Sequence, residues 1–182
     1  MRSEQHHQNS EMSGSKTNGP DTPKYEAMYD RFTERASEFY ASSQEKSREA
    51  MEKAMDAARQ QFTAASEMSA EQGALFKQYM KRDLEQTEQD MRAMGRETKE
   101  YLHPARLGAG ALSSLARMLE ATGSTIQSLA RKAEGSVQFS TGEITTAGTL
   151  TCVKCGQTAQ LTHTSRIPPC PACSGTHFRK GY

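Results

Sequence analysis

Two Cys-x-x-Cys pairs constrain this chain more than any other feature of its sequence. Cys152 and Cys155 form the first pair, Cys170 and Cys173 form the second, and 14 residues separate the pairs. Two residues between thiolates let one tight turn aim both sulfurs at one point, and two such turns make a tetrahedral four-sulfur site that suits Zn²⁺. The sequence therefore predicts one structural Zn²⁺ per chain, held by these four cysteines.

The residues around the cysteines predict a small β zinc ribbon over 136–182. Thr-rich segments at 142–146 and 149–151 have the composition of strands, and 159–163 and 176–179 are expected to form two more. Gly156 and Gly175 stand where the turns are expected to need positive φ. A unit this small cannot bury enough apolar surface to hold itself together, so metal binding is expected to drive its folding. The ribbon and the helices before it are expected to be two independent units.

Other uses of the four cysteines stay open from the residues alone. A rubredoxin-like iron site uses similar knuckles. Two disulfides would need an oxidising compartment, and a catalytic zinc normally keeps a coordination position open, which four cysteines would close. His163 or His177 could replace a cysteine, although both are more simply ordinary ribbon residues.

Composition limits the rest of the chain. Only 35% of its residues are hydrophobic and 7% aromatic, so a large buried core is not expected. No run approaches the roughly 18–20 apolar residues of a membrane span. Residues 1–23 are polar, lack the apolar stretch of a secretory signal, and are predicted to be a disordered tail of a cytoplasmic protein. The net charge of +1 argues against coating nucleic acid by charge alone.

The fold class predicted is mainly α, with a long antiparallel helical hairpin over 24–103 that turns near 66–69. Residues 25–102 contain no Pro, and Ser69 with Gln72 has the form of a capping box. The first helix is expected to run to about residue 65 as a rod of about 60 Å, with the polar stretch 42–47 as a weakly packed stretch or a stutter. The methionine-rich stripe is interpreted as filling a thin helical seam.

A hinge is predicted over 104–110 and a third helix over 111–135. Leucines at heptad-like spacing, Leu112, Leu115, Leu119 and Leu129, mark one face of that helix. The face is too short for a stable coiled coil alone, so it should dock on the hairpin or on a second copy of the chain. Self-association into a homo-oligomer is therefore expected.

The C-terminal motif resembles that of the bacterial YbeL-like zinc-ribbon family. The residues that carry the resemblance are Gly142, Glu143, Gly148, Leu150, Cys152, Cys155, Cys170, Pro171, Cys173 and Phe178. The resemblance implies a helical hairpin followed by a zinc ribbon, and it implies no assigned activity. This chain departs from the pattern at Ser174, which moves the glycine of the second knuckle one position later.

The sequence favours a non-enzymatic protein that acts through protein–protein interaction, with a protein partner it does not identify. It contains no phosphate-binding loop, dinucleotide turn or nucleophile motif. The alternative is a regulator that contacts nucleic acid or the transcription or translation machinery through the ribbon and the hairpin tip. That architecture is similar to DksA-type proteins, although their paired-Asp motif is missing from the turn with Glu67 and Glu71.

A basic and aromatic set in the ribbon supplies the candidate contacts for nucleic acid or a partner. Phe178 could offer a stacking face to a base, or it could belong to the ribbon's small core. The set consists of Arg166, His177, Phe178, Arg179 and Lys180.

Overall fold

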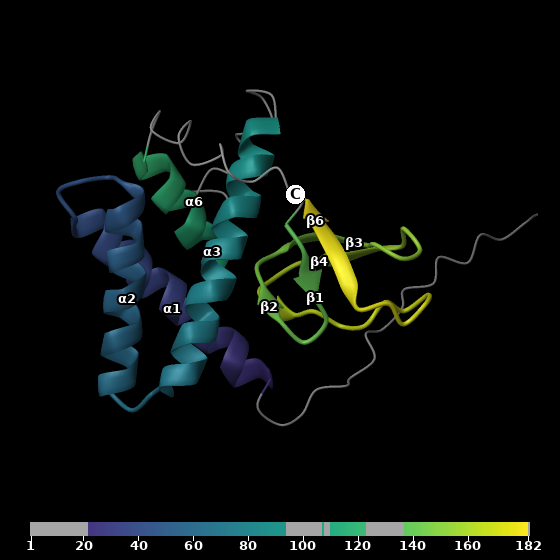
Figure 1. Cartoon of the computed structure of the whole chain (residues 1–182), viewed down its shortest axis with the longest axis horizontal. Coiled ribbons are helices and arrows are strands. Elements are labelled where there is room, and N and C mark those ends of the chain that lie inside the picture. Colours follow the sequence, from purple (N-terminus) through teal and green to yellow (C-terminus); the bar gives the residue numbers. More distant parts are fainter. Residues whose placement is uncertain (1–21, 94–106, 108–109, 123–136, 182) are drawn as a thin grey trace, which may run out of the picture.

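The computed structural model describes residues 22–93, 107, 110–122 and 137–181. Within these ranges four helices precede a small antiparallel β region, so the predicted class, mainly α with a C-terminal β zinc ribbon, is confirmed (Figure 1). The helices are α1 (Thr22–Ser42), α2 (Arg48–Ala64), α3 (Ala70–Ala93) and α6 (Ala111–Thr122). The strands are β1 (Phe139–Ser140), β2 (Ile144–Thr145), β3 (Gly148–Cys152), β4 (Thr158–Leu161), β5 (Ser165–Arg166) and β6 (His177–Gly181).

The predicted single first helix is wrong, because the chain reverses direction at residues 43–47. Lys46 Nζ donates hydrogen bonds to the carbonyl oxygens of Tyr40, Ala41 and Ser43, at 2.7, 2.9 and 2.8 Å, and so satisfies carbonyls at the end of α1. Ser47 then caps α2, since its Oγ accepts from the N–H of Ala50 at 3.1 Å. The polar stretch interpreted as a stutter is a loop with a cap on each side, and the 60 Å rod does not form.

The second reversal lies where the sequence places it, between Ala64 and Ala70. The N–H of Gln72 donates to Ser69 Oγ at 3.1 Å, and the N–H of Ser69 donates to Gln72 Oε1 at 2.9 Å, which confirms the capping box. Gly73 follows in the first turn of α3, and a Cβ there would lie 2.7 Å from Arg59 Cγ. Glycine therefore lets α3 approach α2 closely just after the turn.

An aromatic cluster holds the first three helices together. The Phe76 ring on α3 meets Tyr25, Tyr29 and Phe32 of α1 edge-on, with centroids 5.2, 5.4 and 6.0 Å away. Met55, Met68 and Met80 fill the space around these rings and are almost fully buried. The methionine stripe is therefore core, as interpreted from the sequence.

Helix α6 packs on the helical body of the same chain. Leu115, Met118 and Leu119 are almost fully buried in the helical core, and Tyr40 Oη lies 2.9 Å from Thr122 Oγ1. This covers the first half of the predicted leucine face, while Leu129 and the rest of 123–135 lie outside the described residues. The predicted tail and most of the hinge over 104–110 also lie outside them, except that α1 already begins at Thr22.

The ribbon has its own core and packs against α1 and α3. Its sheet has the strand order β1-β6-β3-β4, and β2 pairs with β5 in a separate two-stranded sheet. Phe139, Leu150, Ile167 and Phe178 form the ribbon core together with Cys152 and Cys170. The ribbon does not stand apart from the helices, because β2 and β6 contact α3 and β5 contacts α1 (Figure 1). No helix in the described ranges is long and apolar enough to cross a membrane.

Candidate metal centre

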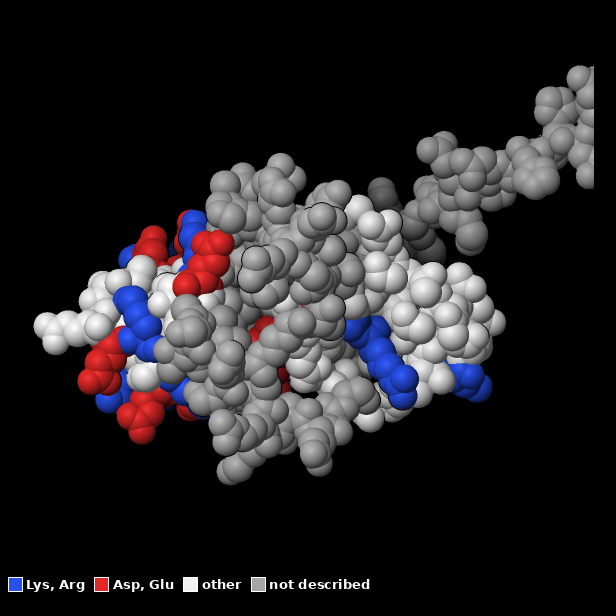
Figure 2. Space-filling view, turned by 90° about the horizontal axis from the view of Figure 1, so that it is seen from above, with Lys and Arg blue, Asp and Glu red and all other residues white. Residues whose placement is uncertain are grey.

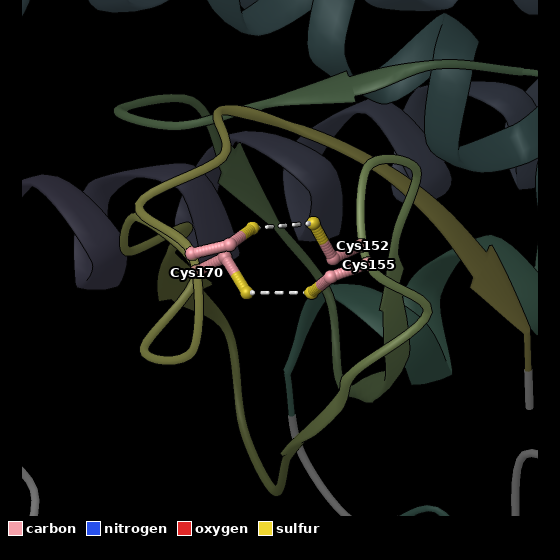
Figure 3. A group of neighbouring side chains, drawn as sticks. Cys152, Cys155 and Cys170 are labelled. Carbon is pink, nitrogen blue, oxygen red and sulfur yellow. Dashed lines mark hydrogen bonds between the residues drawn. The ribbon is translucent and has the colours of Figure 1, made fainter.

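Two knuckles bring the four predicted cysteines together. The first begins at the last residue of β3 and carries Cys152 and Cys155, and the second precedes β6 and carries Cys170 and Cys173. Figure 3 shows the two pairs facing each other from opposite loops, with their sulfurs turned inward. The Sγ atoms of all four residues lie within 4.8 Å of one another. Residues far apart in the sequence thus converge on one point.

The sulfur spacing fits a tetrahedral zinc site. Zn–S bonds of about 2.3 Å place the sulfurs of a tetrahedron about 3.8 Å apart. The Sγ atoms of Cys152 and Cys173 are 3.7 Å apart, and those of Cys155 and Cys170 are 3.6 Å apart. These two sulfur pairs already have tetrahedral spacing, and the four cysteines form a site for one structural Zn²⁺.

Backbone amides prepare the first knuckle for a cation. The N–H of Cys155, and after it the N–H of Lys154, donates to Cys152 Sγ and lowers the pKa of that thiol to about 7. The N–H of Gln157 acts in the same direction on Cys155, but the neighbouring sulfurs and burial outweigh it and raise the pKa of Cys155 to about 12. Four crowded sulfurs cannot all ionise without a cation between them, and Zn²⁺ supplies that charge.

The two knuckles share one backbone pattern despite their different glycine positions. The N–H of Gly156 donates to the Cys152 carbonyl at 2.9 Å, and the N–H of Ser174 donates to the Cys170 carbonyl at 2.8 Å. Gly156 has a φ of +75°, and Ser174 has a φ of +54°. Ser174, and not Gly175, therefore takes the left-handed conformation, which corrects the role predicted for Gly175.

Gly175 has a different function in the second knuckle. A Cβ at this position would lie 3.0 Å from Cys152 Sγ and 3.2 Å from Cys173 Sγ. The glycine is needed for close approach to the metal-binding sulfurs. The shift of glycine by one position thus reflects two separate requirements, one on φ at Ser174 and one on space at Gly175.

The structure divides the five predicted contact residues. Along β6, His177 and Arg179 are exposed, whereas Phe178 and Lys180 are buried. Phe178 belongs to the ribbon core and offers no stacking face. Arg166 lies against α1, since its backbone N–H donates to Glu26 Oε1 at 2.8 Å and its guanidinium lies over the Tyr25 ring. Neither His163 nor His177 joins the cysteine group among the described residues.

Sequence reasoning missed the junction that fixes the ribbon to the helices. The Asp83 side chain on α3 is fully buried and accepts from Tyr29 Oη at 3.0 Å, from Thr145 Oγ1 at 3.0 Å and from the N–H of Thr146 at 3.2 Å. Arg82 also donates to this carboxylate. One signal was available: Asp83 stands seven residues after Phe76 and three after Met80, which puts a carboxylate on the apolar face of α3.

A second carboxylate, Asp30, joins the ribbon to α1 and α6. Asp30 Oδ1 accepts from Thr164 Oγ1 at 2.6 Å and from the N–H of Ala111 at 2.8 Å. Gly110, just before Ala111, has a φ of +125° and brings the chain against Asp30. Asp30 therefore connects α1 both to the start of α6 and to the residue before β5.

Residues 38–181 match a known family of zinc-ribbon-containing domains. The chain belongs to this family. The match covers most of the sequence, including both knuckles and the greater part of the helical body. No curated protein and no solved structure matches the chain. This membership agrees with the tetrahedral spacing of the sulfurs and supports zinc at the site.

Proposed function

We propose that this zinc-ribbon protein is non-catalytic and acts in the cytoplasm by binding another protein through its helices and ribbon. The observation that carries the proposal is the closed shell of four thiolates. A catalytic zinc normally has three protein ligands and an open position for water or substrate. The cysteines use all four positions, so zinc here supplies shape and stability. The resemblance to the YbeL-like family, which implies no activity, supports the same reading.

The exposed apolar side chains indicate where a protein partner would bind. Among the described residues, the large hydrophobic side chains that are exposed are Leu75, at 42%, and Val153, at 53%. Leu75 lies in the second turn of α3, beside the α2–α3 reversal, and Val153 lies in the first knuckle. Lys, Arg, Asp and Glu are intermixed over the helical side, whereas the ribbon side is mostly uncharged in the view of Figure 2. Such surfaces suit contacts with another protein.

Capture of partners by the zinc-loaded chain tests this proposal. The full-length protein is immobilised in its native state, exposed to lysate and cross-linked, and retained proteins are identified by mass spectrometry. We expect a reproducible set of proteins that is reduced by Leu75→Asp or Val153→Asp. Gln78→Asp is the matched control, because Gln78 is also exposed on α3. Equal capture by all three variants, or no specific capture, would contradict the proposal.

A second candidate function is contact with nucleic acid or with the transcription or translation machinery. The outward side chains of β6, His177 and Arg179, favour it, because the neighbouring strands β1 and β3 carry no Asp or Glu. Binding of fluorescent single-stranded RNA at low salt tests it by anisotropy. We expect affinity to fall with rising salt and to be lost in Arg179→Glu. The absence of binding at low salt would remove this candidate.

A further inference from the structure

The junction between α3 and the ribbon buries an acidic side chain of α3 together with a basic side chain of the ribbon. Asp83 lies on α3, while Thr145, Thr146 and Lys180 come from the ribbon. Lys180 Nζ donates to Thr145 Oγ1 at 3.0 Å and to Thr146 Oγ1 at 2.5 Å, and its side chain is almost fully buried. Thr145 Oγ1 and the N–H of Thr146 donate to Asp83 across the junction, and these hydrogen bonds are lost when the two parts separate.

One route from the metal to this junction runs through the pairing of β3 with β6. Cys152, the last residue of β3, pairs with Phe178, and Leu150 pairs with Lys180. The first knuckle fixes the register between β3 and β6, and this register determines which face of the sheet carries the Lys180 side chain. A one-residue slip would turn Lys180 to the outer face and bring Arg179 or Gly181 inward.

A second route runs from the other knuckle through the β2–β5 pair. Ile167, three residues before Cys170, packs in the ribbon core with that cysteine. The N–H of Ile167 donates to the Glu143 carbonyl at 2.8 Å, and the Ile167 carbonyl accepts from the N–H of Gly142 at 2.8 Å. Glu143 in turn accepts from Arg82 of α3 at 2.5 Å through its carboxylate. The second knuckle thus also fixes residues that contact α3.

We propose that zinc binding and docking of the ribbon onto α3 form one coupled equilibrium. With zinc bound, both knuckles hold the strands that cover Asp83 and Tyr29. Without zinc, the ribbon loses its register and separates, because a unit of this size does not keep its fold without the metal. Zinc occupancy thereby controls whether this face of α3 is covered or open to solvent. The inference depends on the metal centre and the junction, and it is independent of any partner.

Hydrogen exchange of the full chain, with zinc and after chelation, tests the direct effect. We expect zinc removal to increase amide exchange in α3 over residues 79–90, in addition to the ribbon itself. Residues 54–62 of α2, which face the aromatic cluster, serve as the internal reference. Unchanged exchange over 79–90, with the ribbon exchanging freely, would overturn the coupling.

Reciprocity provides the second test, because a coupling free energy acts in both directions. Asp83→Asn should weaken zinc binding by about tenfold, measured by competition with a chromogenic chelator. Asp56→Asn is the matched control, since Asp56 accepts from Lys77 at 2.7 Å on the surface between α2 and α3. Lys180→Met provides an independent variant on the ribbon side. Zinc affinity equal to that of the unmodified chain in both junction variants would overturn the proposal.

Discussion

Tyr29 and Asp83, 54 positions apart in the sequence, are joined by a buried hydrogen bond of 3.0 Å from Tyr29 Oη to Asp83 Oδ2. The Tyr29 ring also packs edge-on against Phe76 at a centroid distance of 5.4 Å. One side chain of α1 therefore contributes both to the aromatic core and to the polar junction with the ribbon. The two halves of the molecule meet at this residue.

Tyr29→Phe should lower the free energy of unfolding by about 1 kcal/mol. The substitution keeps the ring contact with Phe76 and removes one donor from Asp83, which retains Arg82 and Thr145 as donors. Urea unfolding followed by circular dichroism measures the change. Tyr25→Phe is the control, because Tyr25 also packs edge-on against Phe76 and its hydroxyl makes no hydrogen bond recorded in the described structure. Equal unfolding free energies for the Tyr29 variant and the unmodified chain would contradict the prediction.

Ser174→Gly should stabilise the zinc-loaded protein by about 1 kcal/mol. Ser174 has a φ of +54°, a left-handed conformation that is strained for a residue with a Cβ and not for glycine. The side chain is exposed, so little packing is lost. Chemical unfolding monitored by ribbon-specific signals tests this gain. Ser165→Gly is a suitable control, because Ser165 lies within strand β5 and the same change there should destabilise.

Gly175→Ala should weaken zinc binding without disturbing the helices. The Cβ of the new alanine would lie 3.0 Å from Cys152 Sγ, which is too close, so the two knuckles must move apart. Chelator competition and isothermal titration measure the affinity, and far-ultraviolet circular dichroism follows the helices. Gly142→Ala is the control. A Cβ at Gly142 has open space around it, so this variant reports only the strain of an alanine at a φ of +91°. Equal zinc affinity in Gly175→Ala and the unmodified chain would show that the knuckle accommodates the methyl group.

Cys152→Ser should remove zinc and unfold the ribbon while most of the helical signal remains. Loss of one thiolate leaves the cation with three ligands and breaks the knuckle that ends β3. Elemental analysis should find one zinc per unmodified chain and none in the variant. Iron in place of zinc, or zinc retained in the variant, would contradict the four-cysteine zinc site.

Burial of Lys180 predicts a specific pH dependence of stability. Desolvation lowers the pKa of Lys180 to about 8, against 10.5 in the unfolded chain, while Asp83 and Asp90 oppose the shift and Arg82 adds to it. Between these values the unfolded chain binds more protons, so the contribution of Lys180 to stability rises with pH from about 8 to about 10.5. Below pH 8 the unfavourable cost is fully present, and above 10.5 it is absent.

A comparison with Lys180→Met isolates this dependence. The unfolding free energy of the unmodified chain should rise relative to that of the variant by up to about 3 kcal/mol across this window. Urea unfolding at several pH values measures the difference. The exposed Lys53 provides the control substitution, Lys53→Met. A difference between the unmodified chain and Lys180→Met that stays constant with pH would rule out the effect.

Local patterns in the sequence predict much of this structure. The capping box at Ser69, the methionine core and the convergence of Cys152 with Cys170 all follow from spacing and side-chain chemistry. The reversal at 43–47 was misread because serines and glutamine are compatible with a helix, and the lysine that caps α1 is recognised only once the chain has turned. The role of Asp83 is not visible in the sequence for a related reason. Its hydrogen-bond donors include Thr145 and Thr146, which lie more than 60 residues away and meet it only in the folded chain.

The sheet order also sets the sequence of events when the chain is synthesised. Strand β6 lies between β1 and β3, so neither of these reaches its central neighbour until residues 177–181 have emerged. Helices α1 to α3 can assemble far earlier, through contacts that are closer in the sequence. Until the ribbon docks, the Asp83 carboxylate on α3 stays hydrated. Cys152 and Cys155 also lack the second pair of thiolates until Cys170 and Cys173 have been synthesised. A chain interrupted between residues 173 and 177 would therefore carry a formed helical body and all four cysteines, but it would lack the strand that joins β1 to β3.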